Sequence, residues 1–353
     1  MRLSSLGDTV LITPILRELK SRFPDSHISV LVKEEYAPVF ENNPHVDRLI
    51  GMDVRGRHRG LGGLRRFIVE LREQGFDIFL DLHRNLRSRL VTFRIRAKRK
   101  FWYNKRRWQR LAMVHAKWLP AEPRHTVDLY FDGLRPLGVE PNDRRPEVFL
   151  TGDEIFFAQD FLRSGGIVED KGLVGIHIGA KGEAKRWLPE RFAHVSDVLS
   201  EHGWSPIFFG GEGDQQFLEE IRSAMRYGPT ILRQLPLRQL IALIDQCSVF
   251  LCHDSGPMHL AVARKVPVVA LFGPTHPKLG FWPLGERDVV LRAEVGCSPC
   301  SLHGTRRCRK RVRECMELIS VDRVLEAVVQ TLDGRREGVG VGTQRGTFLQ
   351  DKG

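Results

Sequence analysis

The sequence predicts an α/β protein with parallel β-sheets, and three observations support this prediction. Short apolar runs alternate along the chain with longer segments whose apolar residues recur at helical spacing. Residues 249–251 and 266–272 are apolar throughout, which is typical of parallel strands buried on both faces. Between them, Asp254-Ser255-Gly256-Pro257 suits the start of a helix, because Asp or Ser caps a first turn and Pro is tolerated there.

The first half of the chain alternates strands and helices in the order that a parallel sheet requires. Its strands are predicted by apolar alternation, and its helices by apolar residues that share one face. The expected elements of this half are residues 9–23 (helix), 27–32 (strand), 61–74 (helix), 76–82 (strand) and 125–137 (helix).

The second half continues in the same way after a Pro- and Asp-rich linker at residues 139–153. Its expected elements are residues 173–178 (strand), 192–201 (helix), 205–209 (strand), 217–225 (helix), 237–246 (helix) and 321–332 (helix), besides the stretch at 249–272. We therefore expect two domains, residues 1–150 and 151–333, followed by a disordered, Gly-rich tail at 334–353.

The turn after residues 249–251 is a candidate site for phosphate groups. A helix that begins just behind a parallel strand presents free N–H groups and the positive end of its dipole, and both favour anions. Asp254 and Ser255 lie at this helix start, Gly256 permits close approach of a ligand, and His259 follows one turn later. The alternative is an ordinary strand–helix turn without a ligand.

Two further segments carry residues suited to a phosphorylated nucleotide. Lys185 and Arg186 follow the predicted strand at 173–178 and would neutralise phosphate charge. Glu212 lies in a glycine-rich turn at the end of the predicted strand at 205–209, where an acid commonly meets a ribose.

The 353-residue chain has a formal net charge of +12, so anionic partners are expected. Residues 84–110 contain twelve Lys or Arg and no Asp or Glu, with aromatic residues between them. Three interpretations are open: a patch for anionic lipid head groups or a phosphorylated acceptor, a nucleic-acid groove with stacking aromatics, or a solvated surface. The candidate contact residues are Arg84, Arg87, Lys98, Arg99 and Lys100.

The sequence has no run of about 18 apolar residues, so no membrane-spanning helix is expected. The first residues also lack the apolar core of a signal peptide, and a cytoplasmic protein is the expectation.

Six cysteines in a chain of this length do not indicate a disulfide scaffold. Four of them follow the spacing C-x2-C-x7-C-x6-C, which resembles a four-thiolate site for a structural zinc or iron ion. The alternative is four reduced cysteines in an ordinary loop. The four are Cys297, Cys300, Cys308 and Cys315.

Three motifs together go beyond a generic α/β chain. They are Leu3-Ser4-Ser5-Leu6-Gly7-Asp8, Lys185-Arg186-Trp187-Leu188-Pro189, and Asp254-Ser255-Gly256-Pro257-Met258-His259 with Phe272-Gly273-Pro274-Thr275 downstream. From about Arg2 to Leu332 the chain resembles glycosyltransferase family 9, the ADP-heptose:lipopolysaccharide heptosyltransferases. The resemblance implies a GT-B fold, in which two Rossmann-like domains face each other across a cleft. The acceptor binds the first domain and the nucleotide sugar the second.

The resemblance also implies roles for individual residues. Asp8 matches the family's candidate base, and Lys185 matches a lysine that contacts the donor diphosphate during transfer. Glu212 matches the acid near the ribose. The residues that match the donor loop and helix are Asp254, Ser255, Gly256 and His259. The four cysteines resemble a cluster found in many relatives.

The function implied by the resemblance is inverting transfer of a heptose from ADP-heptose to a hydroxyl of the lipopolysaccharide inner core, with no cofactor required. The acceptor would be lipid A–core, met by peripheral contact with the inner face of the inner membrane. The alternatives are a protein or other glycan acceptor and, from another class, a nucleic-acid-binding protein or a non-catalytic nucleotide-sugar binder. Nucleic acid is the less favoured partner, because it gives no reason for Lys185, Asp254 and His259 to occur in their motifs.

One departure from the family concerns the first strand. Relatives usually carry several apolar residues before the first motif, whereas only Met1 and Arg2 precede it here. Either the start codon is assigned too late or the strand is truncated, and this strand supports the loop that holds Asp8.

Overall fold

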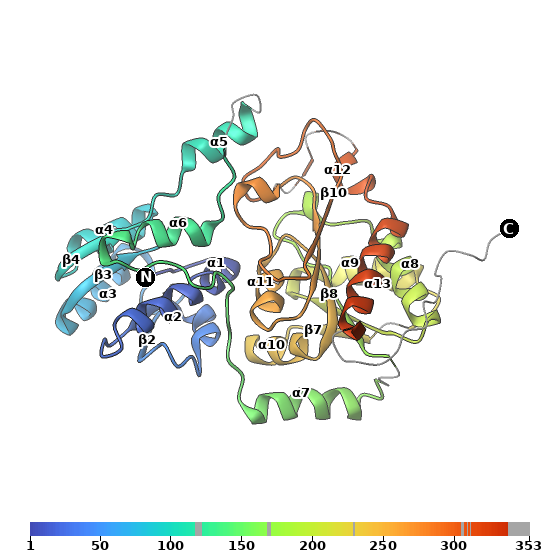
Figure 1. The fold of residues 1–353 in the computed structure, drawn as a ribbon, viewed down its shortest axis with the longest axis horizontal. Coiled ribbons are helices and arrows are strands. Elements are labelled where there is room, and N and C mark those ends of the chain that lie inside the picture. The colour runs from blue at the N-terminus through green and yellow to red at the C-terminus, as the bar shows by residue number, and fades with distance from the viewer. Residues whose placement is uncertain are drawn as a thin grey trace.

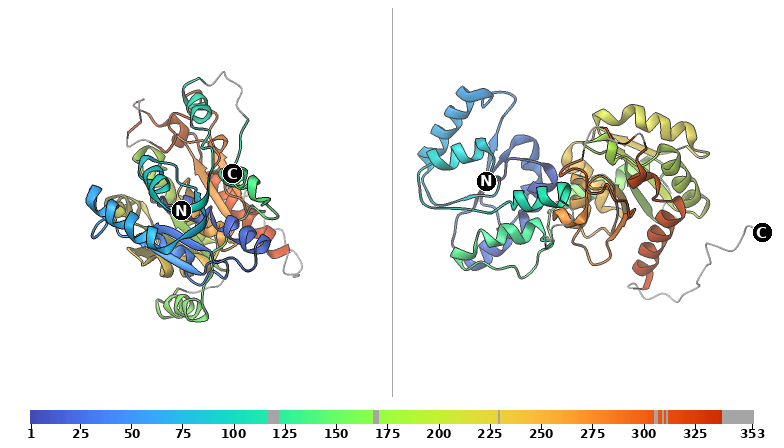
Figure 2. Two further views of the ribbon diagram at one scale, coloured as in Figure 1. Left: turned by 90° about the vertical axis from the view of Figure 1, so that its left-hand side faces the viewer. Right: turned by 90° about the horizontal axis from the view of Figure 1, so that it is seen from above.

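The computed structural model describes residues 1–116, 122–167, 171–228, 230–304, 307–308, 310 and 312–337. Two α/β halves lie side by side, and an extended connection passes from the first half down to a helix below the second (Figure 1). Seen from above, the two halves are separate bodies that meet along one face (Figure 2).

The first half contains two separate pairs of parallel strands, with helices packed around them. Its helices are α1 (Leu6–Val10), α2 (Thr13–Arg22), α3 (Gly60–Gln74), α4 (Leu86–Arg94), α5 (Arg107–His115) and α6 (Thr126–Asp132). Its strands are β1 (Ser29–Lys33), β2 (Arg48–Met52), β3 (Phe76–Asp81) and β4 (Ala97–Trp102). Strand β1 pairs with β2, and β3 pairs with β4.

The helix expected at residues 9–23 is instead two helices, α1 and α2. Pro14 has no N–H to donate to the carbonyl of Val10, so the helical hydrogen bond cannot form there. The Thr13 hydroxyl donates to that carbonyl instead, at 2.9 Å. Because of the break, the short α1 packs against α11 (Gly256–Ala263) of the second half, while α2 packs against α6 of the first half.

The second half is built on one six-stranded parallel sheet in the order β10-β9-β8-β5-β6-β7. The strands are β5 (Leu173–His177), β6 (Ser205–Gly210), β7 (Thr230–Arg233), β8 (Cys247–His253), β9 (Val268–Phe272) and β10 (Val289–Arg292). The helices are α7 (Gly152–Ser164), α8 (Pro189–Glu201), α9 (Gln215–Ala224), α10 (Leu237–Asp245), α11 (Gly256–Ala263), α12 (Glu314–Glu317) and α13 (Val321–Glu337). The parallel strands and crossover helices predicted for this half are confirmed.

Strand β8 is the centre of this sheet and is buried along its whole length. Val249 and Leu251 belong to a core shared with α8, α9 and α13, whereas Phe250 and Cys252 belong to a core shared with α10 and α11. The continuous apolar sequence of β8 therefore reflects two covered faces. Helix α13 extends to Glu337, so residues 334–337 of the expected tail are helical, and its remainder lies outside the described residues.

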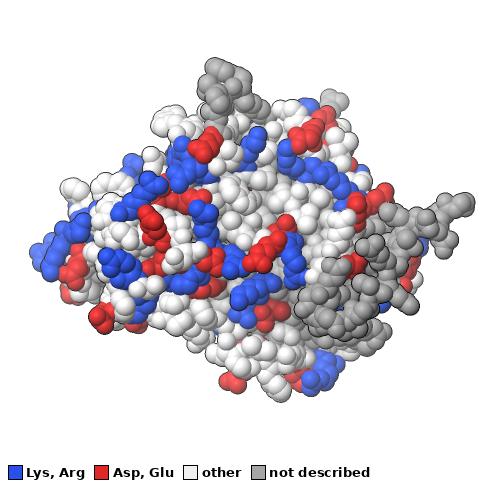
Figure 3. Space-filling model, in the orientation of Figure 1, with Lys and Arg blue, Asp and Glu red and all other residues white. Residues whose placement is uncertain are grey.

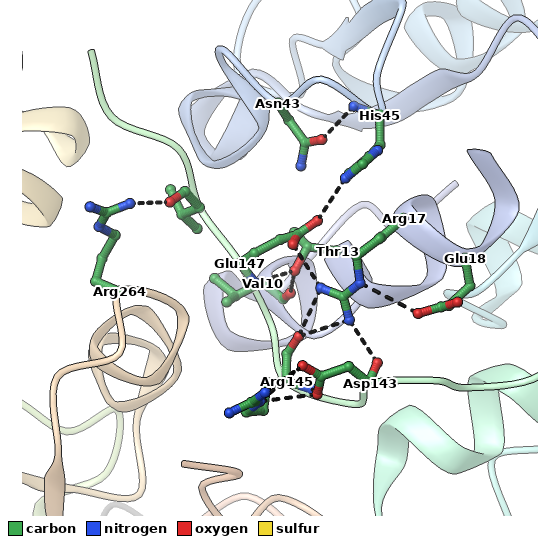
Figure 4. Close-up of polar contacts among 11 residues, drawn as sticks. Val10, Thr13, Arg17, Glu18, Asn43, His45, Asp143, Arg145, Glu147 and Arg264 are labelled. Atoms are coloured by element: carbon green, nitrogen blue, oxygen red, sulfur yellow. Dashed lines mark hydrogen bonds and ion pairs between the residues drawn. The ribbon is translucent and has the colours of Figure 1, made fainter. Parts of the chain in front are cut away.

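The connection between the halves is fixed at both ends (Figure 4). On the first half, the Arg17 guanidinium donates to the Asp143 carbonyl and to the Glu147 carboxylate, each at 2.7 Å. On the second half, Arg264 donates to the carbonyl of Val148 at 2.6 Å. The segment that joins the halves is therefore held to both by buried or half-buried arginines.

An open slot separates β1 from β3. Met1 and Arg2 lie between these strands at their carboxyl ends: the Met1 ammonium donates to the Leu80 carbonyl at 2.7 Å, and the Arg2 amide donates to the Leu31 carbonyl at 3.0 Å. The rest of the gap is a cavity of about 790 Å³, lined by β1, β3 and the apolar face of α2. Apolar side chains of both strands and of α2 face this space, so an apolar segment placed in it would bury them.

We predict that a short apolar extension before Met1 stabilises the first half. Five residues, such as Val-Leu-Ile-Val-Val, would reach from the level of Met1 to the start of β3 at ~3.3 Å per residue. They would fill the cavity and pair with both strand edges, raising the melting temperature by roughly 2–4 °C for each kcal/mol gained. The measurement is thermal unfolding beside a Gly-Ser-Gly-Ser-Gly extension of equal length. Equal melting temperatures for the two extensions would contradict the prediction.

Candidate active site

A pocket of about 700 Å³ lies between the two halves, at the carboxyl ends of β5 and β8. The first half contributes α1 and the residue before it, including Gly7 and Asp8. The second half contributes the start of α11 and the loop that carries Lys185. Ligands of open α/β sheets bind at this end of the strands, so the pocket is the candidate active site.

The halves touch most closely where α1 meets α11. A Cβ atom added to Gly7 would lie 2.8 Å from Cδ2 of His259, and one added to Gly256 would lie 3.0 Å from the Leu6 side chain. A side chain at Gly7 would therefore overlap His259, and one at Gly256 would press against Leu6. The contact brings Asp8, next to Gly7, and Ser255, next to Gly256, into one pocket.

The start of α11 has the features expected of a diphosphate site. Ser255 precedes the helix, Pro257 occupies its first turn, and the helix runs through eight residues to Ala263. The Ser255 hydroxyl is buried, lines the pocket and has no hydrogen-bond partner among the described residues. Unpaired buried hydroxyls are rare in folded proteins, so a ligand atom is expected beside it.

Lys185 supplies a fixed positive charge beside the same helix. It is 8% exposed, and its ammonium donates to the Asp254 carbonyl at 2.9 Å and to the Asp254 carboxylate at 2.8 Å. The Thr275 hydroxyl donates to the same carboxylate at 2.7 Å. Two expected donor-site residues, Lys185 and Asp254, are thus in direct contact, and Thr275 of the third motif is a further partner of Asp254.

The histidines near this site are neutral at physiological pH. Burial lowers the pKa of His259 to about 4, although Asp254 and Asp8 partly oppose the shift. Burial lowers the pKa of His253 to about 3, and His253 Nε2 accepts a hydrogen bond from the Trp187 amide at 2.9 Å. His259 is therefore a neutral ring in the pocket, and cations such as Lys185 supply its positive charge.

Asp8 is held by two neighbours on one of its oxygens. Arg2 forms an ion pair with Oδ2 at 2.5 Å, and Ser5 donates to the same oxygen from its amide at 3.2 Å and its hydroxyl at 3.0 Å. Burial alone would raise the pKa of Asp8, but the charge of Arg2 and these hydrogen bonds together lower it. Asp8 is thus a carboxylate throughout the neutral range.

Glu212, unlike the other predicted donor residues, does not line the pocket. Its side chain is exposed at a 3₁₀ turn, whereas Gly211, Gly213 and Asp214 are the pocket-lining members of that turn in the described chain. Asp214 is buried and forms an ion pair with Arg186. The sequence signal for Asp214 was its position at the end of a strand, which it shares with Glu212.

The basic segment is spread over α4, β4 and the start of α5, on the first half. Lysine and arginine side chains gather on this part of the surface, with acidic side chains between them (Figure 3). Lys98 and Arg99 are exposed, and Lys98 forms an ion pair with Asp77 at 2.7 Å. The Arg84 guanidinium lies 4.9 Å from the centre of the Trp102 ring. Arg87 and Lys100 are half-buried.

Several apolar side chains are exposed in the same segment. Phe93 is 78%, Trp102 50% and Trp108 83% exposed. Tyr103, by contrast, is buried beside Arg2 and Tyr130, so it belongs to the core and is unavailable to a partner. The segment therefore combines exposed cations with exposed aromatic rings.

The four cysteines of the expected metal site lie near one another. Burial, and then the neighbouring thiols of Cys297, Cys300 and Cys308, raise the pKa of Cys315 to about 12. Among the residues described, no three His, Cys, Asp or Glu side chains are placed to hold a metal ion together. The zinc or iron site stays a prediction, and residues 305, 306, 309 and 311 of this loop lie outside the described part.

A family model for glycosyltransferase family 9 (heptosyltransferase) matches residues 64–309. The chain belongs to this family. It is therefore a glycosyltransferase of the heptosyltransferase type, as its three motifs indicated.

Individual relatives agree with this assignment. Lipooligosaccharide heptosyltransferase 2 of Haemophilus ducreyi is 29% identical over 82% of this chain and 86% of its own length. Lipopolysaccharide heptosyltransferase 2 of Salmonella typhimurium is 28% identical over 83% of this chain and 87% of its own.

Solved structures confirm the GT-B fold. A family 9 glycosyltransferase from Veillonella parvula superimposes with a TM-score of 0.78 at 28% identity, covering 94% of this chain and 96% of that one. ADP-heptose lipopolysaccharide heptosyltransferase II of Escherichia coli gives 0.73 at 22% identity, covering 95% and 100%, and shows the shared fold. Among the described helices of the present chain, none has both the length and the apolar character needed to cross a bilayer.

We predict that Gly7→Ala reduces transfer by holding the halves apart. The added methyl group would overlap His259, and a displacement of about 1 Å between reacting groups costs roughly 10–100-fold in rate. ADP binding, measured by calorimetry, should change little, because the diphosphate site belongs to the second half.

Gly62→Ala is the matched control. Gly62 lies in α3 of the same half, and an added Cβ would meet no atom within 4 Å. The prediction is wrong if Gly7→Ala and Gly62→Ala have equal kcat/KM values.

Proposed function

We propose that this enzyme transfers a heptose from ADP-heptose to a hydroxyl of the lipopolysaccharide inner core with inversion at the anomeric carbon. The observation that carries the proposal is that Asp8 and the α11 start line one pocket from opposite halves. Further support comes from the relatives, which are named for heptose transfer to lipopolysaccharide or lipooligosaccharide.

In the proposed reaction, Asp8 is the general base. Its Oδ1 is the oxygen without a contact to Arg2 or Ser5, so it receives the proton of the acceptor hydroxyl. The acceptor oxygen bonds to the anomeric carbon on the face opposite the leaving group, and the bond from that carbon to the diphosphate oxygen breaks. The electron pair of this bond leaves with ADP, and the proton remains on Asp8.

The second half stabilises the leaving diphosphate. Lys185 adds a positive charge, and Ser255 and the free amides of α11 add hydrogen-bond donors. We assign Asp254 to positioning Lys185 and His259 to a neutral contact with the sugar or diphosphate. The ribose is assigned to the turn at residues 211–214, whose pocket-lining acid is Asp214 in place of the expected Glu212. The scheme routes no step through a metal.

The acceptor is proposed to be lipid A–core at the cytoplasmic face of the inner membrane. The exposed cations and rings of residues 84–110 supply the attraction that a peripheral enzyme needs for anionic head groups. The alternatives, a protein or other glycan acceptor, differ in what the first half must bind and leave the donor chemistry unchanged.

We predict that Asp8→Asn abolishes most transfer and leaves the donor site intact. The amide cannot accept the proton, so kcat should fall by roughly 10²–10⁴-fold while the affinity for ADP stays close to wild type. The assay is mass spectrometry of lipid A–core incubated with ADP-heptose and enzyme. Near wild-type transfer by a folded Asp8→Asn variant would remove Asp8 from the role of base.

We predict that charge reversal in the basic segment weakens membrane contact without touching the donor site. The variant Lys98→Glu/Arg99→Glu/Lys100→Glu should bind anionic vesicles less tightly, at ~1 kcal/mol per residue that faces the surface. Its KM for the lipid acceptor should rise, and its KM for ADP-heptose should not.

The control changes the same charge on the second half, at three exposed arginines: Arg163, Arg222 and Arg226. Vesicle sedimentation should separate the two triple variants. Equal loss in both would mean that net charge alone acts, and a loss of donor affinity in the first would assign the segment to the nucleotide site.

A further inference from the structure

Arg2 has contacts that suit a role in the reaction, although it is not among the expected site residues. Its side chain is 5% exposed and lies among β1, β3 and α1. One terminal nitrogen donates to the Leu82 carbonyl at 2.6 Å and lies 3.3 Å from the Tyr103 hydroxyl. The other terminal nitrogen forms the 2.5 Å ion pair with Asp8.

This arrangement fixes the guanidinium before any substrate binds. The backbone amide of Arg2 donates a hydrogen bond to the Leu31 carbonyl on β1. Its side chain donates to the Leu82 carbonyl, just after the end of β3. The guanidinium also lies over the Tyr130 ring, at 5.8 Å from the centre. Arg2 is thus held by Leu31, Leu82, Tyr103 and Tyr130. Because its guanidinium cannot move with the Asp8 carboxylate, the ion pair holds Asp8 in one orientation.

We propose that Arg2 is the positioning residue of the base: it occupies Oδ2 of Asp8 and leaves Oδ1 as the single oxygen that receives the acceptor proton. This inference rests on the proposed function and deepens it. Arg2 does not touch the substrate in this scheme and acts only through Asp8. Ser5 completes the arrangement, because both of its donors also point at Oδ2.

The electrostatic surroundings make Arg2 the decisive neighbour of Asp8. The titratable and charged groups that face Asp8 from the packed elements are Arg2, His83, Tyr103, Lys105, Arg110, Tyr130, His259 and His303. The histidines are held neutral by burial, and the tyrosines have pKa values above their usual range. Arg2 is the group of this set with a direct ion pair to the carboxylate.

Removing Arg2 should raise the pKa of Asp8. Burial raises the pKa of this carboxyl, and Arg2 is the largest effect that lowers it. Without Arg2, Asp8 becomes protonated at a higher pH than in wild type, and a protonated carboxyl cannot accept the acceptor proton. Below its raised pKa, kcat/KM should fall about tenfold for each pH unit.

The experiment is the pH profile of kcat/KM for wild type, Arg2→Met and Arg2→Lys. In wild type the acidic limb should lie below the neutral range. In Arg2→Met it should move to higher pH, with activity recovering as the pH is raised, and Arg2→Lys should lie between the two. Recovery at high pH distinguishes positioning from mere structural damage, which would lower activity at every pH.

Arg17→Met is the matched control, because Arg17 forms a 2.7 Å ion pair with Glu147 in the same half, away from the pocket. Its profile should keep the wild-type shape. If Arg2→Met does not fold, Arg2→Lys decides the question alone. An unshifted limb in Arg2→Lys, or a uniform loss across the pH range in Arg2→Met, overturns the proposal.

The outcome for the proposed function is separate. If wild type transfers no heptose to lipid A–core, the proposed acceptor fails. The role of Arg2 is then tested by following the Asp8 carboxyl by carbon NMR in wild type and Arg2→Lys: a lower pKa in wild type supports it, and equal pKa values overturn it.

Discussion

The candidate active site depends on the close approach of α1 to α11. Gly7 and Gly256 lie at this contact, where a Cβ atom on Gly7 would overlap His259 and one on Gly256 would press against Leu6. Asp8 and Ser255 are the chain neighbours of these glycines, so the distance between the base and the diphosphate site is set by backbone packing. The site can thus be assembled by close backbone packing between the two halves.

Charge in the pocket is arranged by fixed ion pairs, with little left to titration near neutral pH. Lys185 is paired with Asp254, and Arg2 is paired with Asp8. Burial keeps His253 and His259 neutral, since their pKa values lie at about 3 and about 4. A preorganised field of this kind stabilises a departing diphosphate without reorienting during the reaction.

The sequence predicted the second half better than the first, for a physical reason. Strand β8 and helix α11 follow from local signals: a continuous apolar run, then Ser255, Gly256 and Pro257 at a helix start. Pro14 is a sequence signal for the break between α1 and α2. Where the helix breaks depends on which carbonyl, here that of Val10, loses its hydrogen-bond donor. Local patterns identify helices and strands well when the residues that form the pattern are also the ones buried in the core.

Residues whose roles come from distant partners were not predictable in the same way. Arg2 meets Asp8, Leu82 and Tyr103 only after β1 and β3 have been brought together. Tyr103 looked like part of an exposed aromatic set and is buried. Asp214 could not be distinguished from Glu212 in the sequence, because spacing alone cannot show which acid of a turn points into a pocket.

The slot between β1 and β3 connects the packing of the first half to the geometry of the base. Arg2 lies at the end of this slot, with its amide on β1 and its guanidinium on the carbonyl that follows β3. A change in the separation of these strands would therefore shift the guanidinium, and the Asp8 carboxylate paired with it would shift as well. Asp8 depends on long-range packing for its orientation, whereas Ser255 depends on the local start of a helix behind a buried strand.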